Sequence, residues 1–413
     1  MTTLALRRTD RPWRLACLVL LGLLAALPGE ADEGALPAPP PTFPPLQTEV
    51  MVPRLDVISG EAPAPEQAIE AVAMPEEEAA SSGDDDSASP VAPETEQADI
   101  EPVPTVAVAA PEPLAPPPLK RLEIMLDWYP SPRHAPLILA RDNGVLPRNG
   151  LEIVLSTPAD PSVPTRLLAA GRVDLAVTRQ PLLHLQVDRG LPLIRVATLV
   201  GLPLAAVILR DGQGEASLAR LAGKRVGYAD EDGRDILLPA LLKPHGLVPA
   251  ELTLTDVNFG LAAAMVDDEV DGLIVSSRLQ LPRQLADEGA TVQLLRVEEH
   301  GIPLHDGLIL VANRDRLGGQ KEAIRKLIAA LEETTAWMIE FPDEAWRRLI
   351  ASEPSIDTPA NRAAWPEILR RFSTRPAAMD SQRYAGFERF LYERGLVGEE
   401  TPVDRLGVDP GAP

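Results

Sequence analysis

The chain has 413 residues, a formal net charge of −22, 44 prolines and a single cysteine. Its acidity excludes most nucleic-acid binders, because a protein that meets phosphates needs a basic surface. The one cysteine, Cys17, lies in an N-terminal apolar run, so the rest of the chain excludes disulfides, thiolate nucleophiles and cysteine-ligated metals.

The first 31 residues have the pattern of a secretory signal peptide. Four arginines precede an apolar run from Leu15 to Leu27, and Gly29 and Ala31 then offer small residues for cleavage. The run is short for a membrane span, and Cys17 lies inside it rather than after it, which disfavours lipid attachment. We therefore expect a periplasmic or other extracytoplasmic protein. The alternative is a membrane tether through an uncleaved signal segment.

Residues 32–118 are rich in Pro, Ala and Glu, and we expect them to form a disordered linker. They hold 18 acidic residues and one basic residue, Arg54, for a net charge of −17. With +2 on residues 1–31, this leaves −7 on residues 119–413. A segment with so few aromatic residues cannot bury enough apolar surface to offset its ordering entropy. Most of the acidity thus belongs to a solvated spacer, with a specific docking segment as the alternative.

The stretch from Leu122 to Gly144 predicts a strand, a loop and a helix in succession. Apolar residues alternate from Leu122 to Leu126, and two prolines then break the pattern. Pro136 suits the first turn of a helix, which Gly144 should end. Loops at the carboxyl ends of strands line the ligand crevice of open α/β sheets. The loop residues expected at such a crevice are Asp127, Trp128, Tyr129, Ser131, Arg133 and His134.

Hydrophobic segments continue to alternate between strand-like and helical periods over roughly 290 residues, enough for one two-lobed protein or two small domains. After Asn313 the apolar spacing becomes helical. The pattern predicts an α/β fold with mainly parallel sheets and a helical C-terminal region. The other candidate strands are Leu151–Leu155, Val173–Val177, Ile194–Leu199, Leu204–Leu209, Arg225–Tyr228, Val270–Val275, Val292–Leu295 and Leu308–Val311.

Four ordered segments resemble one family of binding proteins. They are DWYPSPRHAPLILARDNG, AAGRVDLAVTRQPLLHLQVDRGLPLIRVATLVGLPLAAVIL, LAGKRVGYADEDGRDILLPALLKPHGL and VEEHGIPLHDGLILVAN. Over residues 120 to about 395 the chain resembles the formylaminopyrimidine-binding, thiamine-precursor-like branch of ABC-importer substrate-binding proteins. The resemblance implies a type II periplasmic-binding-protein-like fold with two lobes, a hinge and a ligand cleft between them. Lobe 1 would hold about 119–205 plus 306–400, and lobe 2 about 206–305.

The resemblance also implies the function and the partners. We expect the solute-binding component of an ABC importer, a monomer that serves permease and ATPase subunits and needs no cofactor, metal or catalytic residue. The same superfamily includes alkanesulfonate- and nitrate-binding proteins and thiamine pyrimidine synthase, whose consumed histidine would correspond to His134. That enzyme carries a cysteine-rich iron motif that this chain lacks. The alternatives are a synthase-like enzyme and a membrane-anchored envelope sensor or scaffold.

Each residue of the first loop has a ligand interpretation and a structural one. Of Trp128 and Tyr129, one should stack on a flat heterocycle and the other pack as core, because adjacent residues of an extended segment point opposite ways; we favour Trp128 for the ligand. Asp127 could accept from an exocyclic amine or cap the loop. His134 could contact the ligand or be structural. The histidines show no spacing typical of zinc ligands.

The second lobe should supply a counterpart of this loop. Tyr228 ends a strand and could face the cleft or be buried at the strand end, and a helix should start near Asp235. Glu299 follows where the chain should cross back between the lobes. It could bind a ligand amino group or remain solvated.

Three positions depart from the family pattern and leave the ligand open. The family usually has Asn at Ser131, an aromatic residue at Arg179, and an aromatic-polar stretch where this chain has Ser276–Gln280, which includes Arg278. Two arginines near the cleft would suit an anionic ligand through bidentate hydrogen bonds. They could instead pair with acidic neighbours such as Asp174 or Asp271.

Overall fold

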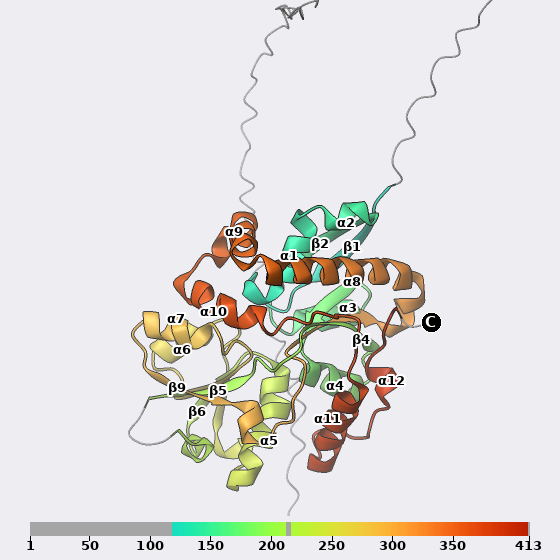
Figure 1. The fold of residues 1–413 in the computed structure, drawn as a ribbon. Helices are drawn as coiled ribbons and strands as arrows, with labels where there is room; N and C mark the ends of the chain where they lie inside the picture. Colours follow the sequence, from blue (N-terminus) through green and yellow to red (C-terminus); the bar gives the residue numbers. More distant parts are fainter. Residues whose placement is uncertain (1–117, 212–215, 412–413) are drawn as a thin grey trace, which may run out of the picture. The chain divides into compact units, whose positions relative to one another are not determined.

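The computed structural model describes residues 118–211 and 216–411 (Figure 1). The predicted signal peptide and linker, residues 1–117, fall outside these ranges. Within them, no helix is long and apolar enough to cross a membrane.

The first of two five-stranded sheets has the strand order β2-β1-β3-β10-β4. β1 pairs in parallel with β2 and β3, whereas β10 is antiparallel to both β3 and β4. Four strands therefore run in one direction and β10 alone is reversed. The strands are β1 (Lys120–Met125), β2 (Leu151–Ser156), β3 (Leu175–Thr178), β4 (Leu193–Val200) and β10 (Leu308–Asn313).

The second sheet repeats this plan with the order β7-β6-β8-β5-β9. Here β5 is the reversed strand, antiparallel to β8 and β9. The chain crosses from the first sheet to the second before β5 and returns before β10, so each reversed strand follows a crossover. The strands are β5 (Ala206–Arg210), β6 (Arg225–Tyr228), β7 (Thr253–Asp256), β8 (Gly272–Val275) and β9 (Val292–Arg296).

The predicted fold class is confirmed, with two mainly parallel sheets and a helical C-terminal region after Asn313. The helices before β10 are α1 (Ala135–Asp142), α2 (Val145–Arg148), α3 (Val163–Ala169), α4 (Gln180–Asp188), α5 (Leu238–Leu242), α6 (Leu261–Val266) and α7 (Leu281–Asp287). Those after it are α8 (Leu317–Glu340), α9 (Pro342–Ser352), α10 (Pro359–Leu369), α11 (Ser381–Arg394) and α12 (Val403–Leu406). Shorter helical turns are Pro132–His134, Leu218–Leu221, Gly233–Leu237, Lys243–His245, Pro249–Glu251, Val297–His300, Arg314–Arg316 and Pro354–Ile356.

The strand–loop–helix prediction for residues 122–144 is also confirmed. α1 has Pro136 in its first turn, and the helix ends before Gly144, which adopts the left-handed φ of 72°. This φ is open to glycine because it has no Cβ to clash. Every residue from Leu137 to Ala140 is fully buried. The buried helix and strand hold the loop between them at the edge of a packed core.

Two helices belong to the cores of both sheets. In α4, Leu183 packs with first-sheet residues, whereas Leu182 packs in the core of the second sheet. In α11, Tyr384 and Phe387 divide in the same way. A further core cluster is formed by the first sheet and the helices α1, α8, α9 and α10, and it includes Leu327 of α8. The two sheets are therefore joined by shared helices as well as by the two crossovers (Figure 1).

Candidate functional site

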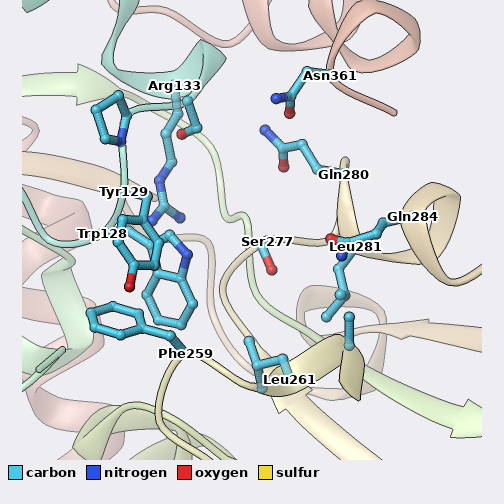
Figure 2. Close-up of a pocket in the computed structure, with 13 residues that line it drawn as sticks. Trp128, Tyr129, Arg133, Phe259, Leu261, Ser277, Gln280, Leu281, Gln284 and Asn361 are labelled. Carbon is cyan, nitrogen blue, oxygen red and sulfur yellow. The ribbon is translucent and has the colours of Figure 1, made fainter. Parts of the chain in front are cut away.

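A cavity of about 200 Å³ lies between loops that follow strands of both sheets (Figure 2). The loop after β1 lines it from the first sheet, and the segments after β7 and β8 line it from the second. Helix α10 adds Asn361. The lining residues are Trp128, Tyr129, Pro130, Ser131, Arg133, Phe259, Leu261, Ala262, Ser277, Gln280, Leu281, Gln284 and Asn361.

Three aromatic rings form one wall of the cavity. The ring of Trp128 meets that of Phe259 edge-on with centroids 4.7 Å apart, and Tyr129 is tilted against Phe259 at 4.6 Å. Trp128 is half-buried against the second-sheet core, whereas Tyr129 is 52% exposed. The sequence predicted one core ring and one ligand ring; in the structure both rings border the cavity, and Trp128 also packs on the core. The chain bends at these residues, so the alternation of an extended strand does not apply.

The opposite wall carries uncharged polar groups. Figure 2 shows Gln280, Gln284 and Leu281 across the cavity from the aromatic rings. Gln284 donates to Glu288 at 2.9 Å, whereas the half-buried Gln280 side chain has no hydrogen-bond partner among residues 118–211 and 216–411. An amide offers both donors and an acceptor. The cavity can therefore receive a small flat ring between aromatic faces and a free amide.

Buried charges from both sheets meet at Arg179, which directly follows β3. Its Nε and Nη2 donate to the two carboxylate oxygens of Asp232 at 3.1 and 3.0 Å. Its Nη1 donates to Asp127 at 3.2 Å, and Nη2 lies 2.9 Å from Asp230. Asp127 follows β1 in the first sheet, whereas Asp230 and Asp232 follow β6 in the second. One guanidinium thus bridges carboxylates of both sheets.

Asp127 is saturated by side chains of its own loop. It accepts from His134 Nε2 at 2.8 Å and lies 3.0 Å from Arg133 Nη2. Arg133 also donates to the carbonyl oxygen of Ser276, beyond β8, at 3.1 Å. The carboxylate is thus bound by side chains rather than by the backbone N–H groups of a loop cap, and only 2% of the residue is exposed. A contact between Asp127 and a ligand amine stays a prediction.

His134 is fully buried and its ring is held at both nitrogens. Nδ1 lies 3.2 Å from the Ser131 backbone nitrogen, which donates to it, so the ring proton belongs on Nε2 and is donated to Asp127. Burial lowers the pKa of His134, which keeps the ring neutral. The histidine positions Asp127 and Ser131 and does not line the cavity, whereas Ser131 does.

The surroundings shift the pKa values of Asp127 and Asp230 in opposite directions. Burial alone would raise the pKa of Asp127, but Arg133, His134 and Arg179 together hold it well below its usual value. Burial raises the pKa of Asp230 to about 6, although Arg179 opposes the shift. Ser276 Oγ donates to Asp230 at 3.1 Å.

The predicted second-lobe residues lie outside the 200 Å³ cavity. Tyr228 is half-buried, with its hydroxyl 3.4 Å from Arg234 Nη1. Arg278 is buried and donates to Glu298 at 2.8 Å. Glu299 is exposed and accepts from Arg296.

The predicted charge partners also differ. Asp174 accepts from the Glu123 backbone rather than from Arg179, and Asp271 pairs with Arg225 rather than with Arg278. On the helical turn Val297–His300, neighbouring side chains diverge, so only Glu298 reaches Arg278. The helix expected near Asp235 begins at Gly233.

Sequence reasoning missed part of the site. Phe259 follows β7, an edge strand that the pattern did not predict. Gln280 reaches the cavity from just before α7, Gln284 from within α7 and Asn361 from α10. Asp230 and Asp232 had a signal, since they follow a predicted strand at its carboxyl end, where ligand loops lie.

Comparisons with known proteins agree with the fold and identify relatives. The family model described as NMT1/THI5 like matches residues 131–345. A putative thiamine biosynthesis protein of Haemophilus influenzae is 36% identical over 291 residues, which cover 70% of this chain and 92% of the relative. The formylaminopyrimidine-binding protein of Halalkalibacterium halodurans is 30% identical over 241 residues, 58% of this chain and 73% of the relative.

More distant matches include a synthase and an alkanesulfonate-binding protein. The 4-amino-5-hydroxymethyl-2-methylpyrimidine phosphate synthase THI11 of Saccharomyces cerevisiae is 26% identical over 264 residues, 62% of this chain and 77% of the enzyme. The alkanesulfonate-binding protein SsuA from Xanthomonas axonopodis pv. citri, solved with MOPS, matches with a TM-score of 0.56 and 16% identity over 70% of this chain and 98% of its own. This likeness shows the fold, which is that of periplasmic binding proteins. The chain belongs to the NMT1/THI5-like family.

Proposed function

We propose that the protein is the solute-binding component of an ABC importer, which captures a thiamine pyrimidine precursor or a related small heterocycle between its two lobes. The cavity between the sheets carries the proposal, because it sets an aromatic wall against a free amide. Aromatic faces hold flat rings, and a few placed polar groups orient them. The name of the Halalkalibacterium halodurans relative supports the same class of solute.

The charges of the site favour a neutral heterocycle over an anion. Arg179 and Arg278, the arginines expected to attract an anion, are both paired with carboxylates. Arg133 is the one charged residue among those lining the cavity, and it is paired with Asp127. An anion would have to compete with a buried carboxylate for its partner. Sulfonates and nitrate are therefore the weaker candidates.

We propose binding rather than catalysis at this site. His134, the residue that corresponds to the consumed histidine in the resemblance to the synthase, is fully buried and held by Asp127 and Ser131. A reacting imidazole must be reachable by its reaction partner, and the His134 ring is not exposed to the cavity. The export predicted from the N-terminal sequence supports the proposal, because a solute receptor binds its solute outside the cytoplasmic membrane and then delivers it to the permease.

Isothermal titration with a panel of solutes tests the function. We expect formylaminopyrimidine or hydroxymethylpyrimidine to bind more tightly than thiamine, alkanesulfonates or nitrate. Preference for an anion would overturn the charge argument, and no binding by any of the five would reject the proposed solute class. Incubation with iron and pyridoxal phosphate, followed by mass spectrometry of the peptide containing His134, should show no modification.

A further inference from the structure

The guanidinium of Arg179 stands where the carboxyl ends of strands from both sheets converge. Asp127 reaches it from β1, and Asp230 and Asp232 reach it from β6. Ligands of α/β sheets bind outside the carboxyl ends of strands, and in a two-lobed protein those ends face one cleft. The centre of the cleft is thus filled by a side chain of the protein itself.

The contacts of Arg179 are those that a planar nitrogen cation would make. Its N–C–N edge donates two bonds, of 3.1 and 3.0 Å, to the two oxygens of Asp232, and its remaining nitrogen donates to Asp127. An amidinium offers the same paired donors to a carboxylate. We propose that Arg179 is a built-in ligand, which occupies the centre of the cleft and holds the two lobes closed when no solute is bound.

Charge explains why this contact would hold the lobes together. Three aspartates meet two arginines in the buried cluster, and Arg133 contacts only Asp127 among them. Without Arg179, the second-sheet Asp230 and Asp232 would face Asp127 with little compensation. Uncompensated buried carboxylates repel one another and seek water. Separation of the lobes would supply that water.

The inference rests on the proposed function, because it takes the two sheets to be lobes that can separate. It also narrows that function, since the solute would bind beside Arg179 in the aromatic cavity rather than among the aspartates. The test uses the solute-free protein. Its result therefore stays valid even if no solute is found to bind.

The test measures the distance between the lobes. Val248→Cys on the second-sheet side and Ile339→Cys on α8 place spin labels at exposed positions, in a Cys17→Ser background. Without solute, we expect a single short distance in the otherwise unchanged protein and a longer one in Arg179→Ala. Millimolar guanidinium chloride should restore the short distance. Equal concentrations of urea, a planar neutral molecule, or of sodium chloride should not.

Control variants separate this role from a general loss of stability. Arg225→Ala removes an arginine–aspartate pair within the second sheet and should leave the distance unchanged. If Arg179→Ala does not fold, Asp232→Asn removes the bidentate partner and should lengthen the distance with no response to guanidinium. The inference is overturned if the solute-free protein already has the long distance. It is also overturned if guanidinium restores closure no better than urea or sodium chloride.

Discussion

The indole of Trp128 meets Phe259 edge-on at 4.7 Å and borders the cavity. Loss of one aromatic contact is worth about 0.5–1.5 kcal/mol beyond the buried area. Trp128→Ala should therefore weaken solute binding on the order of tenfold, measured by titration calorimetry. Tyr392→Ala, which removes an exposed ring on α11, is the matched control and should bind as before. Equal affinities of the two variants would remove Trp128 from the site.

Asp230 should give the stability of the protein a distinct pH dependence. Its pKa is raised from 3.8 to about 6 by burial, against the effect of Arg179. Between about pH 4 and pH 6 the folded state keeps a proton that the unfolded chain has released, so this group makes the free energy of unfolding fall as pH rises. Asp230→Asn has no such proton. The variant should gain stability relative to the wild type across this window and show a constant difference above it.

Chemical denaturation at several pH values measures that difference. Other groups also titrate nearby, because burial lowers the pKa of both His134 and His305. Their contribution is lost as pH falls below about 6.5. It is common to both proteins and cancels in the difference. A difference that does not change between pH 4 and pH 6 would show that Asp230 is ionised in the folded state throughout.

At the scale of elements, sequence patterns predicted the strands that are buried in the core and missed a strand that is not. Strands such as β4 and β10 are buried along their whole length, and segments composed mainly of apolar residues revealed them. The edge strand β7, with the sequence TLTD, has one apolar residue, Leu254, and none of its residues is fully buried. Hydrogen bonds to β6 alone define it as a strand.

The residues of the site also fall into a part that the sequence predicted and a part that it did not. Tyr129 and Ser131 lie on a loop that follows a predicted strand, and the structure brings both to the cavity. Arg179 was recognised as unusual, but its partner Asp232 is 53 residues away in another sheet. No local sequence pattern shows whether a charged residue will pair with a distant residue of opposite charge or will stay unpaired and bind a ligand. The choice between pairing and ligand binding required the relative positions of the two sheets.

The crossovers contact one another through their backbones. A Cβ at Gly307 would lie 2.2 Å from the carbonyl oxygen of Leu202, on the other crossover. Backbone cannot yield as a flexible side chain does, so Gly307→Ala should cost more than about 2 kcal/mol of stability. Gly318→Ala is the contrasting change, because Gly318 lies in the first turn of α8 with open space around it, so the variant should be at least as stable as the original protein. Urea denaturation measures both, and equal effects would contradict the backbone contact.

At the scale of the whole described region, side chains join the two sheets into one packed unit. His184 of α4 and Glu388 of α11 lie 2.5 Å apart in full burial, and both helices carry residues of both cores. Tyr384 and Arg383 of α11 also donate to Asp306 on the returning crossover. The connection therefore has its own polar network. The lobe movement proposed above would keep these contacts and break those that loops make between the sheets, at Arg179 and between Arg133 and Ser276.

The cores of the described region draw on residues between Leu122 and Leu406. A chain that begins at residue 118 should therefore fold with the melting temperature of the full chain and bind the same solute equally well. A chain that begins at residue 127 lacks β1, which lies between β2 and β3 and buries Leu122 completely, so it should not fold. Circular dichroism and calorimetry compare the three chains. Lower stability or lower affinity of the chain that begins at residue 118 would contradict this prediction and would show that residues 1–117 contribute to folding or binding.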